Sequence, residues 1–151
     1  MNQKPKGKGK IQIFTDGGSR GNPGPAAIGY VIKDEIGHTI KSHGEVIGNT
    51  TNNEAEYRAV LSALQKAKAL LGGKRIKDIE TEVYMDSQLV VRQLNHEYKL
   101  EEEKLFPFFI KIWNLQTAFG KITFAHIPRE KNREADRLVN GALDKDNQKL
   151  F

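Results

Sequence analysis

The chain has 151 residues, enough for one domain with a real core and too few for two comfortable ones. Its 38% hydrophobic and 28% charged residues are typical of a globular protein, and no apolar stretch is long enough to cross a bilayer, so we expect no membrane association. Cysteine is absent, which excludes disulfides and agrees with a cytoplasmic protein, while a net charge of +5 modestly favours polyanionic partners.

The N-terminal end of the chain is basic and lacks the apolar core of a secretory signal. Its lysines are separated by single Pro or Gly residues: Lys4, Lys6, Lys8 and Lys10. We therefore expect residues 1–9 to form a disordered basic arm and residues 10–151 to form a single domain with no interior linker.

Three strands are predicted in the first third of the domain. Alternation of apolar and polar residues predicts a strand over 10–16, and two further strands are predicted over 26–33 and 39–47. The Gly-, Asn- and Pro-rich segment 17–25 predicts a turn, and a second turn is expected around 34–38. Short connections of this kind are typical of an antiparallel meander.

Helices and strands alternate in the rest of the chain. The clearest helix covers 52–71, because its apolar residues recur at helical spacing and Gly72-Gly73 follows. The remaining predicted elements are a strand over 79–85, a short helix over 87–95, a helix over 104–119, a strand over 121–127 and a helix over 132–145. This order predicts an α/β fold in which a mixed sheet is covered by helices.

The helix predicted over 104–119 carries a wide apolar stripe that we expect to be buried. The stripe consists of Leu105, Phe108, Phe109, Ile112, Leu115 and Phe119. Trp113 falls beside it, so we expect a core or core-edge position for this residue rather than a platform on which a base could stack.

Four carboxylates occupy positions that ordinary packing does not explain together. Asp16 and Asp86 each end a predicted strand, and Glu56 and Asp136 each lie in the first turn of a predicted helix. Singly, three of them have ordinary explanations: Asp16 as a turn starter, Asp86 as a helix N-cap and Asp136 as a favourable charge near a helix N-terminus. If all four converge, they cannot stay ionised without divalent metal, which predicts a metal-dependent phosphoryl-transfer enzyme.

Two neighbouring glutamates are predicted to differ in role. Glu54 lies three residues after Thr51, which is a capping-box pattern, and we expect it to face solvent. Glu56 heads the apolar face of the same helix, where a carboxylate is costly unless it is paired or bound to metal.

The chemistry of the four side chains favours a hard cation. Carboxylate oxygens without cysteine indicate Mg²⁺ or Mn²⁺ rather than zinc. Basic residues near Asp136 suit a phosphate backbone, and they are Arg129, Lys131, Arg133 and Arg137. The sequence has no histidine pattern for zinc, no nucleophile elbow and no phosphate-binding loop.

Four motifs resemble the ribonuclease H type 1 family, and they occur in the family's order from residue 10 to about 145. They are Thr15-Asp16-Gly17-Gly18 with Gly21-Asn22-Pro23-Gly24-Pro25, Thr51-Asn52-Asn53-Glu54-Ala55-Glu56-Tyr57, Asp86-Ser87-Gln88, and Asn132-Arg133-Glu134-Ala135-Asp136. The resemblance implies a ribonuclease H-like fold, with a five-stranded mixed sheet of three antiparallel and then two parallel strands, flanked by helices. It also implies an endonuclease that hydrolyses the RNA strand of RNA–DNA hybrids and leaves 5′-phosphate and 3′-hydroxyl products.

On this resemblance, two ions of Mg²⁺ or Mn²⁺ are held by Asp16, Glu56, Asp86 and Asp136. One ion would activate the attacking water and the other would stabilise the leaving 3′ oxygen, with the ions roughly 3.5–4 Å apart. The residues that match hybrid-contacting positions of the family are Gly17, Asn22, Asn52, Asn53 and Gln88. Glycine allows close backbone approach, and amides can donate and accept at a 2′-hydroxyl. Duplex RNA is left open as a second substrate, and a monomer is the default expectation.

The chain departs from the family's pattern in two places. The loop Pro128-Arg129-Glu130-Lys131 has no histidine where many members carry one, and it is similar to the shortened loop of the archaeal-like branch. On that likeness we expect Arg129 to assist at the substrate, and we expect His126 to be structural or at the margin of the site. Segment 98–104 is short and acidic where many members have a basic protrusion, so affinity for the hybrid must come from elsewhere.

Two other functions are compatible with parts of this pattern. One is a hybrid- or duplex-binding module without cleavage, which the intact set of carboxylates argues against. The other is a junction resolvase or transposase-type nuclease on the same fold, which would not be expected to share the Gly-Asn-Pro-Gly turn and the Asn-Asn pair.

The lysines of the predicted basic arm are expected to contribute to binding of an RNA–DNA hybrid. Deleting residues 1–9 should weaken binding of an RNA–DNA hybrid more at low salt than at high salt, because lysines that neutralise phosphates release counterions. Fluorescence anisotropy across a salt series measures this effect. An unchanged salt dependence would show that the arm does not contribute.

Overall fold

The computed structural model describes residues 9–148, so residues 1–8, most of the predicted basic arm, and residues 149–151 lie outside the described residues. In chain order the strands and helices are β1 (Lys10–Ser19), β2 (Gly24–Asp34), β3 (Thr39–Thr50), α1 (Asn52–Leu71), α2 (Gly73–Asp78), β4 (Glu80–Met85), α3 (Gln88–Leu94), α4 (Phe106–Gln116), β5 (Lys121–His126) and α5 (Arg133–Gln148). Two short 3₁₀ turns, η1 (Glu103–Leu105) and η2 (Arg129–Lys131), precede α4 and α5.

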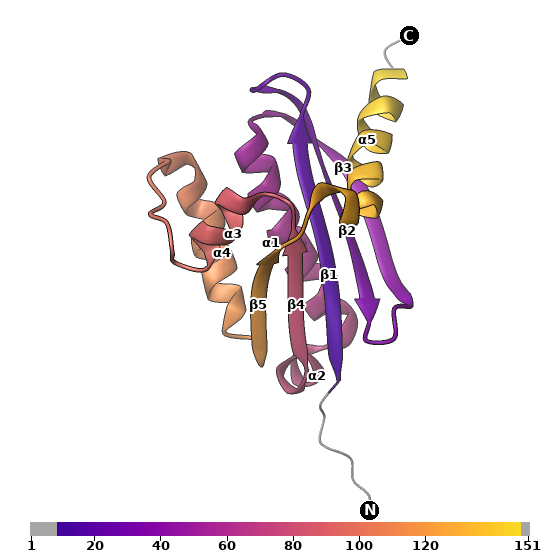
Figure 1. Ribbon diagram of the computed structural model, residues 1–151, viewed down its shortest axis with the longest axis vertical. Coiled ribbons are helices and arrows are strands. Elements are labelled where there is room, and N and C mark those ends of the chain that lie inside the picture. Colours follow the sequence, from indigo (N-terminus) through magenta and orange to yellow (C-terminus); the bar gives the residue numbers. More distant parts are fainter. Residues whose placement is uncertain (1–8, 149–151) are drawn as a thin grey trace, which may run out of the picture.

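The strands form one mixed sheet in the order β3-β2-β1-β4-β5 (Figure 1). β1 pairs antiparallel with β2, and β2 pairs antiparallel with β3. β1 pairs parallel with β4, and β4 pairs parallel with β5. The predicted fold, with three antiparallel strands followed by two parallel ones, is therefore confirmed.

Helices cover the sheet on both sides. α1 packs on β1 and β2 and also contacts α4, while α5 packs on β2, β3 and β1 from the other side (Figure 1). The interior strand β2 is covered on both faces, so every residue from Ala26 to Ile32 is buried. β4 instead alternates, with Thr81, Val83 and Met85 buried between more exposed neighbours.

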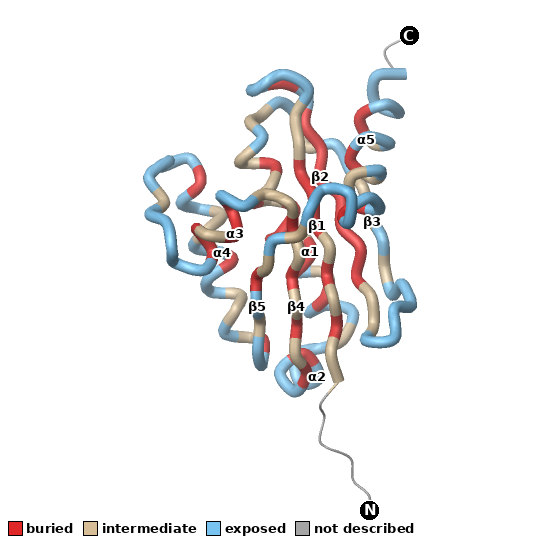
Figure 2. The backbone as a smooth tube through the Cα atoms, viewed as in Figure 1, coloured by how far each residue is buried: buried red, intermediate tan, exposed pale blue. Residues whose placement is uncertain are grey.

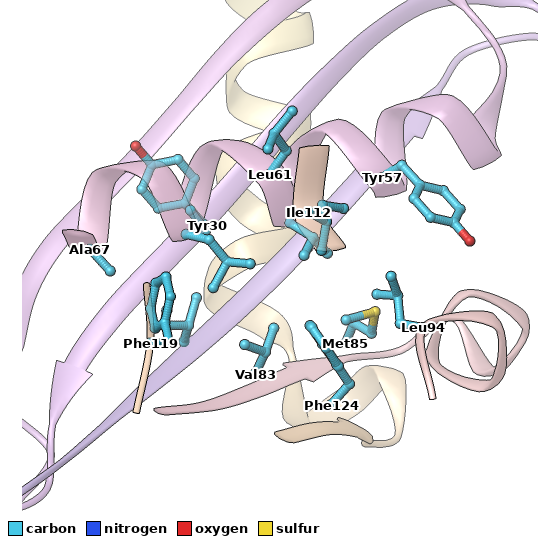
Figure 3. Packing of buried hydrophobic residues seen from close by; sticks show 14 of the residues in the cluster. Tyr30, Tyr57, Leu61, Ala67, Val83, Met85, Leu94, Ile112, Phe119 and Phe124 are labelled. Atoms are coloured by element: carbon cyan, nitrogen blue, oxygen red, sulfur yellow. The ribbon is translucent and has the colours of Figure 1, made fainter. Parts of the chain in front are cut away.

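The main hydrophobic core lies between the sheet and the helices α1, α3 and α4 (Figures 2 and 3). Its largest fully buried side chains include Tyr57, Leu64, Ile76, Met85 and Ile112. A second and much smaller cluster holds α5 against the sheet through Ala27, Val139 and Leu143. The two clusters lie on opposite faces of the sheet, so α5 contributes little to the main core.

Both ends of α1 agree with the sequence. The Thr51 side chain accepts a hydrogen bond from the Glu54 backbone N–H at 3.2 Å, as the capping pattern predicts. Gly72 ends the helix with φ 87°, and its N–H donates to the Lys68 carbonyl. Glu54 is only partly exposed, because its carboxylate lies 3.4 Å from the Arg58 guanidinium one turn later.

The turn predicted over 17–25 is shorter in the structure. β1 continues through Ser19 and β2 begins at Gly24, because Gly17 and Gly18 pair across the sheet with Ile28 and Ala27. Asp16 therefore lies inside a strand, opposite Gly29, rather than at its end. The sequence also did not predict α2, which begins directly after α1 ends.

The expectation for Trp113 was wrong, because its side chain is 55% exposed. The face of this helical segment that enters the core passes through Leu105, Ile112 and Phe119, which recur every seven residues. Trp113 follows Ile112 directly and is turned about 100° around the helix axis from it, which takes it out of the core.

Among residues 9–148, none of the helices combines the length and the apolar composition needed to pass through a bilayer.

α5 approaches the sheet closely at Gly29. A Cβ atom at this position would lie 2.6 Å from the Ala135 carbonyl oxygen and 3.2 Å from a Val139 methyl group. The helix can rest on the strand at this distance only because residue 29 has no side chain.

We expect Gly29→Ala to destabilise the fold by about 1–3 kcal/mol, since the new methyl group must push α5 away from β2. Urea denaturation followed by circular dichroism measures the change. Gly141→Ala is the matched control, because Gly141 lies within α5 with open space around it and the alanine should stabilise the helix by up to about 1 kcal/mol. Equal effects of the two variants would contradict the contact.

Candidate metal centre

Three of the predicted carboxylates meet at one point. One carboxylate oxygen each from Asp16, Glu56 and Asp86 lies within 4.8 Å of the others. These three residues line a cavity of about 490 Å³, and Asp136 lines it as well. The four side chains that were expected to converge thus share one concave site, and they come from β1, α1, the end of β4 and the first turn of α5.

Glu56 reaches Asp16 because α1 crosses β1 without a side chain between them. A Cβ atom on Gly17 would lie 2.3 Å from the Ala55 carbonyl oxygen and 2.6 Å from the Glu56 nitrogen. Any side chain at residue 17 would hold the start of α1 away from the strand. The glycine after Asp16 is therefore what lets the two carboxylates approach.

Asp86 does not act as the cap of the helix that follows it. The N-cap of α3 is Ser87, whose hydroxyl accepts a hydrogen bond from the Val90 N–H at 3.3 Å. The ordinary explanation of Asp86 as a cap is therefore wrong. Its carboxylate belongs to the acidic cluster at the carboxyl end of β4.

Asp136 is brought to the site by a buried asparagine. Asn132 is 1% exposed, and its amide donates to the Thr15 carbonyl oxygen at 2.8 Å, next to Asp16 in β1. The Asn132 carbonyl in turn accepts the Asp136 backbone N–H at 3.1 Å, one turn into α5. This pair of hydrogen bonds fixes the start of α5 beside β1.

The electrostatics of the site favour a bound cation. Burial, followed by the charges of Asp86 and Asp136, raises the pKa of Asp16 to about 8. Burial, followed by Asp16 and Asp86, holds the pKa of Glu56 well above its usual range, although a backbone hydrogen bond from Gly17 opposes the shift. The Arg129 guanidinium lowers both pKa values, but it is the smallest contribution to each.

These residues fit a divalent metal. The Oε1 atom of Glu56 is buried and has no hydrogen-bond partner among the described residues, which is costly unless a cation coordinates it. The donor set consists of carboxylate oxygens, as hard ions such as Mg²⁺ and Mn²⁺ prefer.

The residues expected to contact substrate divide into two groups. Gly17, Asn52, Asn53 and Arg129 line the cavity, whereas Asn22 and Gln88 do not. Asn22 instead accepts the Asn52 backbone N–H at 2.9 Å and so ties the β1–β2 turn to the start of α1.

Two further residues in the cavity were missed by the sequence reasoning. Arg20 lies 2.8 Å from the Asp144 carboxylate and donates to the Asn140 side-chain oxygen at 3.3 Å. Asn140 in turn donates to the backbone carbonyl of Asp136 at 3.2 Å and to its carboxylate at 3.4 Å. Two signals were available: Arg20 is the one charged residue in segment 17–25, and Asn140 follows Asp136 by one helical turn.

The loop before α5 places Arg129, and not a histidine, at the cavity. Its guanidinium lies 3.7 Å from the Asp136 carboxylate and is largely exposed. His126 is exposed at the end of β5 and is not among the residues that line the cavity. The structure thus gives His126 no contact with the site.

Comparison with known proteins connects this arrangement to one family. A family model described as "Reverse transcriptase-like" matches residues 14–142. The chain is 40% identical over 141 residues to Ribonuclease HI of Halobacterium salinarum, covering 93% of this chain and 68% of that protein. It is 38% identical over 136 residues to a bifunctional protein of Mycobacterium tuberculosis, covering 89% of this chain and 36% of that protein.

Solved structures agree with these matches. LC11-RNase H1 in complex with an RNA/DNA hybrid superposes with a TM-score of 0.85 at 50% identity, covering 90% of this chain and 98% of the other. RNase H1 from Halobacterium salinarum superposes with a TM-score of 0.83 at 39% identity, covering 91% and 99%.

The raised pKa of Asp16 predicts how stability depends on pH in the absence of metal. The pKa rises from 3.8 to about 8, so between these values the folded protein holds a proton that the unfolded chain has lost. The free energy of unfolding in chelator should therefore fall as pH rises from about 4 to 8, by at most about 1.4 kcal/mol per pH unit for this one proton. Asp16→Asn removes the group that titrates. The free energy of unfolding of the variant should therefore increase relative to that of the wild type as pH rises toward 8.

Glu54→Gln provides the control for this prediction. It removes a carboxylate from the first turn of α1 that faces Arg58 and not the acidic cluster. Chemical denaturation of all three proteins in chelator at several pH values gives the comparison. Parallel curves for the wild type and Asp16→Asn would exclude a raised pKa at Asp16.

Proposed function

The chain belongs to the ribonuclease H type 1 family, and we propose that it is a metal-dependent endonuclease that hydrolyses the RNA strand of RNA–DNA hybrids. The observation that carries this proposal is the acidic cluster, in which oxygens of Asp16, Glu56 and Asp86 approach within 4.8 Å inside a cavity also lined by Asn52 and Asn53. Metal-binding groups and groups able to sense a sugar hydroxyl thus share one surface.

We assign the metal ligands to Asp16, Glu56, Asp86 and Asp136. Mg²⁺ or Mn²⁺, two ions per site, would supply an activated water and neutralise the charge that develops on the leaving 3′ oxygen, giving 5′-phosphate and 3′-hydroxyl products. The fold holds the four carboxylates close together although their charges repel one another. Gly17 and Asn132 support this spacing, through the close approach of α1 and the hydrogen bond to β1.

We assign recognition of the hybrid to the rim of the cavity. RNA differs from DNA by its 2′-hydroxyls, which lie in a wide and shallow minor groove. Gly17 permits close backbone approach, and the amides of Asn52 and Asn53 can donate and accept at a hydroxyl. Arg129 and Arg20 are the cations that line the cavity, so they are available to phosphates on either side of the cut.

Asn22 and Gln88 have weaker support as direct contacts. Asn22 does not line the cavity, and its side-chain oxygen is already occupied by the Asn52 N–H. We assign it the role of holding the β1–β2 turn in place. Gln88 is exposed at the start of α3, where only a substrate that extends beyond the cavity would reach it. On the cysteine-free composition we also propose a cytoplasmic location.

The decisive experiment compares substrates. A labelled RNA–DNA hybrid, duplex RNA, duplex DNA and junction DNA are each incubated with Mg²⁺, Mn²⁺ or chelator. We expect metal-dependent loss of the RNA strand in the hybrid. Binding of the hybrid without cleavage in either metal would favour a binding module instead, and cleavage of junction DNA would favour a resolvase-type nuclease.

Asp86→Asn should lower the rate of hybrid cleavage at least about 100-fold, because it removes a charged metal ligand. The fold should stay intact, because asparagine keeps the shape of the side chain. Calorimetric titration with Mg²⁺ should show weakened metal binding in parallel. Asp78→Asn is the matched control, since Asp78 lies just before the opposite end of β4 and should change neither quantity. Retained activity in Asp86→Asn would refute the assignment of that ligand.

A further inference from the structure

One of the four assigned metal ligands is placed differently from the other three. Oxygens of Asp16, Glu56 and Asp86 lie within 4.8 Å of one another, and Asp136 is not part of that group. Asp136 lies in the first turn of α5, which rests on the sheet through a small apolar cluster. The orientation of its carboxylate therefore depends on the side chains that contact it directly.

Twose side chains contact this carboxylate, Asn140 and Arg129. The Nδ2 atom of Asn140 donates to Asp136 Oδ1 at 3.4 Å and to the Asp136 backbone carbonyl at 3.2 Å. The Arg129 guanidinium approaches the same Oδ1 atom at 3.7 Å and is 78% exposed. Because both groups meet Oδ1, they restrain the rotation of the carboxylate and leave Oδ2 for other ligands.

Arg20 determines which way the Asn140 amide faces. Its Nη2 atom donates to Asn140 Oδ1 at 3.3 Å and lies 2.8 Å from an oxygen of Asp144. Since a donor already meets Oδ1, the amide turns its Nδ2 atom toward Asp136. A flipped amide would set its NH₂ group against the guanidinium and its oxygen against the Asp136 carboxylate, and both contacts would be repulsive.

The contacts join α5 to the β1–β2 turn. Asp136, Asn140 and Asp144 recur every four residues, which places them on one face of α5. Arg20 lies in the turn, where its backbone N–H donates to the Pro25 carbonyl at 2.8 Å. A side chain anchored in the sheet thus acts on the metal ligand through one intermediate amide.

Stability alone does not account for these contacts. The side chains of Arg20 and Asp144 are 45% and 62% exposed, and exposed ion pairs contribute little to the free energy of unfolding. Asparagine is also a poorer helix former than alanine, so Asn140 weakens α5 at an exposed position in the middle of the helix. A role in orienting the metal ligand accounts for both features.

We propose that Asn140 is a positioning residue, which holds the Asp136 carboxylate in the orientation that a divalent ion requires, and that Arg20 holds Asn140 in turn. The inference rests on the proposed function, because it takes Asp136 as a ligand. Both residues act on the metal through Asp136. The guanidinium of Arg20 has five N–H donors, so it can also meet a phosphate of the substrate.

Asn140→Ala removes the amide that holds Asp136. Calorimetric titration with Mg²⁺ in the absence of nucleic acid should show metal affinity lowered about tenfold. The kcat for hybrid cleavage should fall in parallel, while KM for the hybrid stays within about twofold. The melting temperature should not fall, because alanine is the better helix former.

Two outcomes of this experiment would overturn the proposal. One is a Mg²⁺ affinity equal to that of the wild type. The other is a variant that melts at a lower temperature and loses hybrid affinity together with kcat, which would assign Asn140 a structural role.

Arg20→Met tests whether Arg20 acts through Asn140. Alone it should lower the affinity for Mg²⁺, and in the Asn140→Ala background it should lower it no further. Because the titration contains no nucleic acid, contacts of Arg20 with phosphates do not affect the result. Additive losses would overturn the part assigned to Arg20.

Asn147→Ala is the matched control, because it makes the same change on the same helix at a residue that does not line the cavity. It should leave Mg²⁺ affinity and kcat unchanged. The wild type separates this inference from the proposed function. A wild type that binds no Mg²⁺ would overturn both, whereas a wild type that binds Mg²⁺ and cleaves the hybrid, but is matched by Asn140→Ala, would overturn this inference alone.

Discussion

Mutual repulsion among buried carboxylates is the constraint on which the rest of this structure depends. Asp16 and Glu56 are largely removed from water and lie within reach of Asp86, whose charge raises the pKa of both, and the charge of Asp16 raises the pKa of Glu56 further. Among residues 9–148, Arg129 is the cation that lowers the pKa values of Asp16 and Glu56, and both values nevertheless stay raised. The arrangement is stable as a charged site only when a cation shares it, and the surrounding fold must hold it open until one binds.

The fold meets this requirement by letting two helices approach the sheet at points that have no side chain. α1 crosses β1 at Gly17 and brings Glu56 to Asp16, while α5 rests on β2 at Gly29 and brings Asp136 from the other face. Asn132 then joins the start of α5 to β1 through a buried hydrogen bond. Residues more than a hundred positions apart are thereby fixed to one another, Gly29 and Ala135 by close backbone approach and Thr15 and Asn132 by a buried side-chain hydrogen bond.

The sequence predicted the strands, the antiparallel meander and the residues of the acidic cluster because these follow from local signals, whereas the parallel directions of the last two strands were implied by the family resemblance. Alternation marks strands, and Glu56 stands out as a charge on an apolar helix face. Contacts between distant segments were harder to predict. The extension of β1 past Asp16 depends on pairing with β2, and the link from Arg20 to Asn140 spans 120 positions. Trp113 was misplaced because it borders the apolar stripe of a helix that has a second apolar face.

The small size of the hydrophobic cluster beneath α5 affects how the protein unfolds on heating. Ala27, Val139 and Leu143 anchor this helix, whereas α1, α3 and α4 share the main core. The terminal helix can therefore come loose in a sub-global opening that leaves the other layers intact. Such an opening carries Asp136 away from its three counterparts, so on heating the protein would be inactivated at a lower temperature than the one at which its secondary structure melts.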